Sequence, residues 1–351
     1  MKRNYPVGIQ NFEKIRNGNY CYIDKTDLIY QLIKSGQYYF LSRPRRFGKS
    51  LLISTLEAYF QGKKELFEGL AIEQLEKEWI EYPILHLDLN AQKYDTPESL
   101  YSILNNALCI WESLYGSRPS ETNLSLRFQG VIQRAAEKWN RPVVILIDEY
   151  DKPMLQAIGN EPLLNDYRNT LKAFYGVMKS CDKYIQFALL TGVTKFSKVS
   201  VFSDLNNLMD ISIDNRFANI CGITEKELLS NFKEDIIELG QKNGMTEEET
   251  KAYLKEMYDG YHFVEYGDDI YNPFSLLNTF AKMKFGSYWF ETGTPTFLVE
   301  LLKHSEYDLH RLTEEMTSAD SLGGIDTMYS NPIPILYQSG YLTIKGYDKE
   351  F

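Results

Sequence analysis

The segment Arg43-Pro-Arg-Arg-Phe-Gly-Lys-Ser50 constrains the fold more than any other part of the chain. An apolar run from Tyr38 to Leu41 precedes it, and a good helix-forming sequence from Leu51 to Phe60 follows it. A strand, a loop ending in Lys-Ser and a helix form the layout of a loop that binds nucleotide phosphates. Backbone N–H groups and the helix N-terminus hold the phosphates in such a loop, and the lysine reaches the terminal ones.

The segment departs from the usual pattern, G-x-x-x-x-G-K followed by Ser or Thr, because its first position is Arg43. An ordinary basic turn before a helix is the alternative, but the flanking strand and helix favour a phosphate-binding loop. We expect Ser50 to be a ligand of Mg²⁺, whereas Arg45 and Arg46 are either nucleotide contacts or surface charge. The predicted nucleotide-binding residues are Arg45, Arg46, Phe47, Gly48, Lys49, Ser50 and Leu51.

A second motif lies about 100 residues further along the chain, in the run from Pro142 to Asp151. Its apolar part is too short for a membrane span and is typical of a strand buried on both faces. The strand ends in two carboxylates, Asp148 and Glu149. At the carboxyl end of a central parallel strand, we expect Asp148 to lie near the metal and Glu149 near an attacking water.

Two further residues are candidates for the same site. The run from Tyr184 to Val193 reads as another buried strand and carries Thr191, which either senses the γ-phosphate and orients water or only caps the strand end. Arg216, near the predicted domain junction, is a candidate for the arginine that accelerates phosphoryl transfer, supplied in cis or by a neighbouring copy. A structural salt bridge between domains is its alternative role.

Strands and helices alternate up to residue 220, which predicts an α/β fold with a parallel sheet covered by helices on both faces. The alternating pattern from Pro83 to Asn90 suits a strand near the sheet edge, and 208–213 would be the last strand. Beyond Thr224, two capping boxes and apolar residues at helical spacing predict helices. We therefore expect an ATPase-like domain over 1–220 and a mainly helical domain over 221–351.

Composition narrows the possible partners. No stretch approaches about 18 apolar residues and no signal region follows the first residues, so we expect a cytoplasmic protein without membrane contact. A net charge of −10 disfavours nonspecific nucleic-acid binding. The four cysteines and four histidines lack the spacing of a zinc site.

The chain resembles the bacterial AAA-ATPase-like family. The motifs that carry the likeness are Tyr22-Ile-Asp-Lys-Thr26, the loop 43–50, Leu146-Ile-Asp-Glu-Tyr-Asp151, Leu190-Thr-Gly-Val-Thr194, Tyr258-Asp-Gly-Tyr-His-Phe263, Tyr271-Asn-Pro-Phe-Ser275 and Tyr288-Trp-Phe-Glu-Thr-Gly-Thr-Pro295. The resemblance implies a P-loop ATPase of the additional-strand class, in which arginine at position 43 is usual. It also implies that the Thr191 strand lies between the phosphate-loop strand and the Asp148 strand.

Many relatives continue into a nuclease-like domain of the PD-(D/E)XK type. The E-x-K at Glu249-Thr250-Lys251 lies in a predicted helix, whereas that chemistry needs a strand and turn. Any nuclease would therefore lie beyond Phe351. The strand-and-turn pattern from Tyr341 to Phe351 likewise favours a missing downstream domain.

These observations predict Mg²⁺-dependent ATP binding and hydrolysis, coupled to a conformational change between the two domains. The alternatives are a nucleotide-binding regulatory switch with little hydrolysis, and an adaptor that acts with a nuclease-like domain or nucleic acid. The opening segment from Tyr5 to Phe12 would pack over the base. The glycine turns at 259–263 and 292–295 serve either domain packing or ligand binding.

Overall fold

The computed structural model describes residues 3–196, 207–264, 267–291, 296–304, 316–322 and 331–346. At its centre lies a five-stranded parallel sheet of order β2-β3-β4-β1-β5. The strands are β1 (Tyr38–Ser42), β2 (Ile84–Asp88), β3 (Val143–Asp148), β4 (Ile185–Gly192) and β5 (Met209–Asp210). The predicted α/β fold is confirmed: β4 lies between β1 and β3, and β2 lies at an edge.

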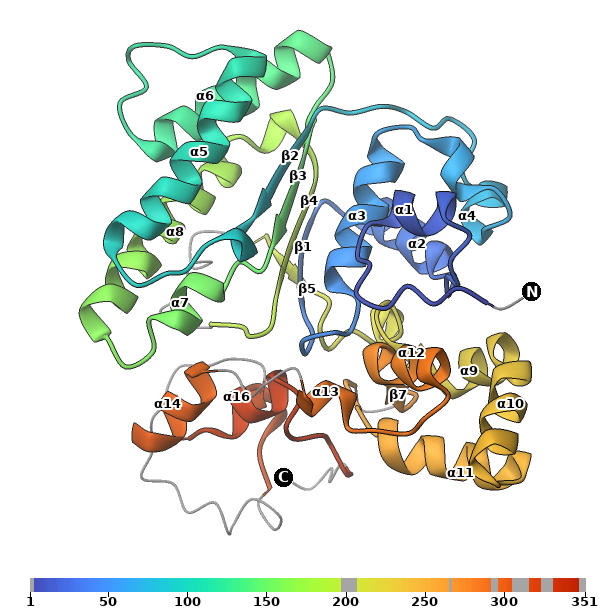
Figure 1. Cartoon of the computed structure of the whole chain (residues 1–351). Coiled ribbons are helices and arrows are strands. Elements are labelled where there is room, and N and C mark those ends of the chain that lie inside the picture. The colour runs from blue at the N-terminus through green and yellow to red at the C-terminus, as the bar shows by residue number, and fades with distance from the viewer. Residues whose placement is uncertain are drawn as a thin grey trace.

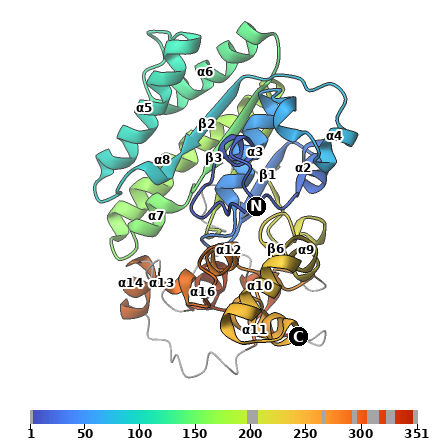
Figure 2. The same ribbon diagram turned by 45° about the vertical axis from the view of Figure 1, so that its right-hand side comes forward.

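Helices cover both faces of the sheet, as Figures 1 and 2 show. One face carries α5 (Pro97–Tyr115), α6 (Leu124–Trp139), α7 (Lys152–Gln156) and α8 (Glu161–Ser180). The other carries α1 (Phe12–Asn17), α2 (Thr26–Ser35), α3 (Lys49–Phe60) and α4 (Ala71–Leu75). Short 3₁₀ turns occur at Lys64–Phe67, Leu89–Ala91, Asp182–Tyr184 and Asn215–Phe217.

Strand β3 shows why its sequence is apolar without alternation. Val143, Ile145 and Ile147 pack in the core beneath α5, α6 and α8, whereas Val144 and Leu146 pack on the opposite side with α3. Successive side chains of a strand point to opposite faces, so a sheet covered on both sides needs apolar residues at every position.

The C-terminal part lies below the carboxyl edge of the sheet in Figure 1 and is mainly helical. Its helices are α9 (Glu225–Asn231), α10 (Lys233–Asn243), α11 (Glu247–Tyr258), α12 (Pro273–Lys282), α13 (Tyr288–Glu291), α14 (Thr296–His304), α15 (Ala319–Leu322) and α16 (Ile333–Gln338). Both predicted capping boxes form, Thr224 with Glu227 and Thr246 with Glu249. The two-stranded antiparallel pair β6 (Ile223–Thr224) and β7 (Ile270–Tyr271) was not predicted.

The last predicted strand, 208–213, is mostly absent, because β5 has only two residues. Ser212 ends the pairing: its hydroxyl accepts a hydrogen bond from Ser42 N at 2.8 Å, and its own N–H donates to Asp210 Oδ1 at 2.9 Å. The turn at 292–295 and the end at 347–351 lie outside the described residues, and 341–346 form no strand. None of the described helices is long and apolar enough to cross a bilayer.

Candidate active site

The loop between β1 and α3 turns sharply before the helix begins at Lys49. Gly48 has a φ of 101°, which a side chain would strain, so the pattern needs glycine here. Arg46 also has a positive φ, 67°. The loop is fastened to the sheet by Arg43 N–H, which donates to Gly192 O at 3.1 Å.

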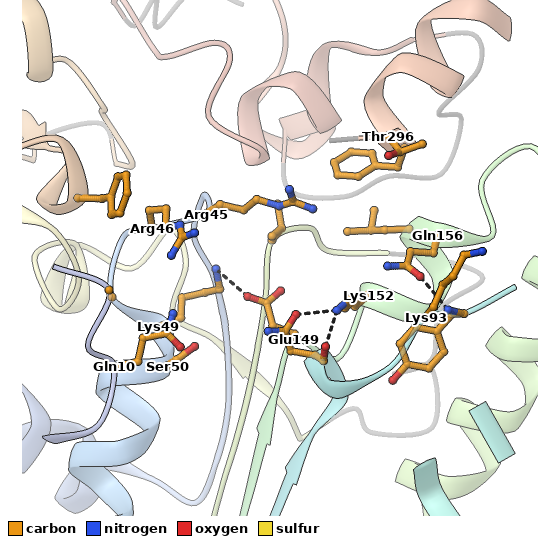
Figure 3. A pocket seen from close by; sticks show the side chains of 18 of the residues that line it. Gln10, Arg45, Arg46, Lys49, Ser50, Lys93, Glu149, Lys152, Gln156 and Thr296 are labelled. Carbon is orange, nitrogen blue, oxygen red and sulfur yellow. Dashed lines mark hydrogen bonds and ion pairs between the residues drawn. The ribbon is translucent and has the colours of Figure 1, made fainter. Parts of the chain in front are cut away.

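Lys49 is buried, and its ammonium group faces the acidic end of β3. Its Nζ donates to Arg43 O at 3.0 Å and to Pro44 O at 3.3 Å, and lies 3.5 Å from Glu149 Oε1 (Figure 3). The lysine and glutamate that the two motifs predicted therefore meet, although about 100 residues separate them.

Arg43 explains how the loop accommodates an arginine where the usual pattern has glycine. Its side chain is buried, and Nη1 donates to Ser42 O at 2.9 Å and Ser212 O at 2.7 Å, while Nη2 donates to Ala218 O at 3.3 Å. The guanidinium also stacks over Phe263, 4.1 Å from the ring centroid. Arg43 thus joins the loop to the segment after β5 and to the C-terminal part.

Asp148 is buried at the end of β3, where two donors fix its carboxylate. Thr191 Oγ1 and Glu149 N–H both donate to Oδ1, the latter at 3.1 Å. No other described residue donates to Oδ2 of Asp148, so that oxygen has capacity for a further ligand. Thr191 is fully buried on the neighbouring strand and holds Asp148 in position.

Glu149 adopts a left-handed backbone conformation, with a φ of 54°. Such a conformation costs of order 1–3 kcal/mol for a residue with a side chain and is frequent at functional sites. Tyr150 N–H donates to Thr191 O at 2.9 Å and holds the turn. The Glu149 side chain is 22% exposed and points into a cavity.

Asp151 supports this turn and was not among the predicted site residues. It is fully buried, and its carboxylate accepts hydrogen bonds from Val193 N, Thr194 N and Thr194 Oγ1, the last two at 2.7 Å. Burial, with the neighbouring charge of Glu149 second, raises its pKa to about 6. Its only sequence signal was a third acid in the run from Asp148 to Asp151.

A cavity of about 800 Å³ opens at the carboxyl edge of the sheet (Figure 3). Its walls come from the N-terminal segment 6–10, the loop between β1 and α3, the segments after β2 and β3, and helices α12 and α14. The predicted residues that line it are Arg45, Arg46, Gly48, Lys49, Ser50, Leu51 and Glu149. This volume lies within the range of about 300–1,000 Å³ that small-molecule sites occupy.

The remaining predicted residues do not line the cavity. The Phe47 ring is buried, with centroids 4.7 Å from Tyr261 and 5.6 Å from Phe263, so its side chain packs against the C-terminal part. Asp148 and Thr191 lie at the carboxyl ends of the central strands β3 and β4. The ring of Phe47 thus faces away from the cavity, and only its backbone belongs to the loop between β1 and α3.

Arg216 does not line the cavity. Its exposed guanidinium forms an ion pair with Asp214 at 2.6 Å and lies 5.3 Å from the Phe217 ring centroid. This ion pair is local, because Asp214 is only two residues away, and it does not link the two predicted domains. The side-chain oxygen of Asp214 caps the 3₁₀ turn and draws Arg216 to it.

Two basic side chains complete the cavity wall. Lys152 was missed: its Nζ donates to Asn90 O at 2.6 Å and Asn90 Oδ1 at 2.7 Å, and burial lowers its pKa. Arg45 is exposed and reaches across the cavity, 5.9 Å from the ring centroid of Phe297 on α14 (Figure 3). No local pattern predicts either contact, because Asn90 and Phe297 are distant in the sequence.

The sheet order and the loop after β1 define the class of this protein as an α/β P-loop NTPase-like fold. The chain belongs to the AAA-ATPase-like family, whose description is Predicted AAA-ATPase and whose match covers residues 6–202.

One relative is an uncharacterized protein in the vnfD 5′ region of Azotobacter chroococcum mcd 1, 38% identical over 344 residues. The match covers 98% of this chain and 64% of that relative, so the chain spans less than two thirds of the relative's length. No solved structure matches the chain.

Proposed function

We propose that this chain binds ATP and hydrolyses it in a Mg²⁺-dependent reaction coupled to a conformational change between residues 1–220 and the mainly helical part 221–351. The observation that carries the proposal is the 3.5 Å approach of Lys49 Nζ to Glu149 Oε1 at the cavity wall. A buried cation from the loop and a carboxylate from the acidic strand are the two groups that ATP hydrolysis needs there.

The loop would hold the phosphates. Lys49 would exchange its bonds to the carbonyl groups of Arg43 and Pro44 for the β- and γ-phosphate oxygens. The backbone N–H groups of residues 45–51 would bind the same phosphates at the start of α3. Arg45, which lines the cavity and is exposed, would be the arginine that accelerates phosphoryl transfer in cis.

Ser50 and Asp148 fit a Mg²⁺ ion, because one or two oxygen ligands from protein, with phosphates and water, are its usual set. Asp148 would act through Oδ2, directly or through water, since Oδ1 already accepts two hydrogen bonds. The ion would neutralise charge that develops on the phosphate oxygens. Thr191 contributes as a positioning residue through its hydrogen bond to Asp148.

Glu149 would orient the attacking water. The water oxygen forms a bond to the γ-phosphorus while the bond to the β–γ bridging oxygen breaks, and Glu149 accepts the water proton. Lys49 would keep the Glu149 carboxylate aimed at the phosphate site until nucleotide enters. The constrained backbone at Glu149 supports this use, since strain of this kind accumulates at functional positions.

The adenine base of ATP would lie between the N-terminal segment Pro6–Gln10 and the start of α12. Phe274 lies on the cavity wall there, with Arg46 stacked 4.8 Å from its ring centroid. A flat base suits such an aromatic and guanidinium wall. Because Phe274 belongs to the C-terminal part, a bound nucleotide would contact both proposed domains.

The experiment is phosphate release from ATP by the full chain with Mg²⁺, run with Glu149→Gln and Lys49→Met. We expect Glu149→Gln to lower turnover by at least about 10²-fold with nucleotide binding retained, and Lys49→Met to lose about 10² to 10³-fold by losing charge stabilisation. Glu137→Gln is the matched control, because Glu137 is an exposed carboxylate on α6 away from the cavity.

Three outcomes separate the alternatives. Release that is lost in Glu149→Gln and kept in Glu137→Gln supports the ATPase. ATP binding without release would favour the regulatory switch. Neither binding nor release by the unmutated chain would overturn the proposal. A nuclease-like partner domain, which the resemblance implies, nucleic acid and a homo-oligomer are further hypotheses, and no contact among the described residues favours one of them.

A further inference from the structure

A second cavity, of about 210 Å³, lies in the C-terminal part. Its walls come from the end of α11, the start of α12, helix α13 and the segment after α16. It includes the glycine turn Asp259-Gly260-Tyr261, for which the sequence left open either packing or ligand binding. The cavity is smaller than the range of about 300–1,000 Å³ for drug-sized ligands, so it suits a small group.

Asp259 places a buried carboxylate on this cavity. Its side chain is only 3% exposed, and neither carboxylate oxygen accepts a hydrogen bond of normal geometry from the described residues. The nearest cation, Lys255 Nζ, lies 3.5 Å from Oδ2, is half exposed and also lies 3.4 Å from Glu225 Oε1. Burial raises the pKa of Asp259. A buried carboxylate with such weak partners is unfavourable until a donor binds it.

Aromatic rings form much of the remaining wall, namely Tyr258, Tyr261, Trp289, Phe290 and Tyr341. The Trp289 ring centroid lies 5.0 Å from that of Phe290 and 5.1 Å from that of Tyr341. The faces of such rings carry negative charge density and attract cations. Asn272 adds a second buried polar group. Its Nδ2 has no hydrogen-bond partner among the described residues.

We propose that this cavity, which we name the aromatic cavity, binds a small organic cation, an alkylammonium or guanidinium group whose N–H groups donate to Asp259. The ring faces would stabilise its charge, and an oxygen on the same ligand would accept from Asn272 Nδ2. A bare metal ion fits poorly, since it would meet one carboxylate among aromatic rings.

The test is a ligand-observed NMR titration of the full chain with methylguanidinium and with N-methylurea, which has the same shape without the charge. We expect methylguanidinium to bind at least about tenfold more tightly, because hydrogen bonds between charged groups are the stronger ones. Asp259→Asn should weaken methylguanidinium binding by at least about tenfold. Phe290→Ala, at a ring that is 65% exposed, should weaken it by about two- to fivefold.

Asp268→Asn is the matched control, because Asp268 is an exposed acid nine residues away whose carboxylate accepts a hydrogen bond from Asn219 Nδ2 at 3.0 Å. It should leave binding unchanged. Equal binding of the two probes would overturn the proposal. So would full binding by folded Asp259→Asn, or no binding of methylguanidinium at about 10 mM. If Asp259→Asn does not fold, Phe290→Ala and the probe pair still decide.

Discussion

Two cavities among the described residues lie near the same loop and differ in chemistry. The larger is lined by Arg45, Arg46 and Lys49 and suits an anion, whereas the smaller has Asp259 among aromatic rings and suits a cation. The larger cavity is lined by residues of the loop itself, whereas the smaller one reaches the loop through residues of its wall. Trp289 Nε1, on the wall of the aromatic cavity, donates to Arg45 O at 3.1 Å.

Residues of this one short loop face two different surfaces of the protein. Gly48, Lys49 and Ser50 line the larger cavity, and their pattern is what makes the loop recognisable. Arg43 and Phe47 point instead to the C-terminal part, where both contact Phe263. Arg43, the position at which the loop departs from the usual pattern, and Phe47, at a position that the pattern leaves open, therefore join the loop to the rest of the protein.

The largest expected effect comes from Arg43. Arg43→Met removes the donors of three carbonyl oxygens and should lower the free energy of unfolding by about 2–4 kcal/mol. Arg43→Gly restores the usual loop pattern, yet we expect it to lose at least as much stability. Urea unfolding measures both changes.

Arg46→Met is the control for Arg43, since Arg46 is exposed in the same loop and should change stability by less than about 0.5 kcal/mol. If Arg43→Gly were as stable as the unmutated chain, the loop would not depend on the C-terminal part. The contrast between the two groups of loop residues would then fail.

Local patterns explain why much of the fold was predictable. Apolar runs ending in Asp148 and Thr191 identify buried parallel strands, and the carboxyl ends of parallel strands meet at one edge. Both motifs are therefore expected at that edge, where Lys49 Nζ lies 3.5 Å from Glu149 Oε1. The order of β4 between β1 and β3 came from the resemblance, since no local pattern fixes strand order.

Contacts across long sequence separations explain what was not predictable. The burial of Arg43 depends on Phe263 and Ala218, and that of Asp151 on Thr194. Arg216 shows the opposite case, because its partner is the nearby Asp214. The sequence alone does not indicate whether a charged residue will pair with a neighbour in the chain or with a distant residue.

A smaller expected effect is a pH dependence of stability that comes from Asp151, the buried acid that holds the turn at Glu149. The pKa of Asp151 is about 6 in the folded chain, above its ordinary value of 3.8, because of burial and then Glu149. Between about pH 4 and pH 6 the unfolded chain has lost this proton while the folded chain still holds it. Stability from this group is therefore full below about pH 4 and is lost as pH rises through about 6.

Glu149→Gln should reduce that loss, since it removes the neighbouring negative charge and lowers the Asp151 pKa. We expect the difference in unfolding free energy between about pH 4 and pH 7 to shrink, by on the order of 1 kcal/mol. Glu137→Gln should leave the difference as it is. An unchanged difference in Glu149→Gln would mean that the two acids do not interact.

The smallest effect would connect the two cavities and rests on both proposals. Methylguanidinium in the aromatic cavity would press on Trp289 and Tyr261, which contact Arg45 O and the Phe47 ring. We expect saturating methylguanidinium to change the Kd for ATP by about threefold, and ATP to change the Kd for methylguanidinium by the same factor. Trp289→Phe keeps a ring but removes the N–H donor, so it should reduce this shift while the cation still binds. If both ligands bind and neither changes the other's Kd, the loop separates the two cavities instead of connecting them, because linkage requires the effects to be reciprocal.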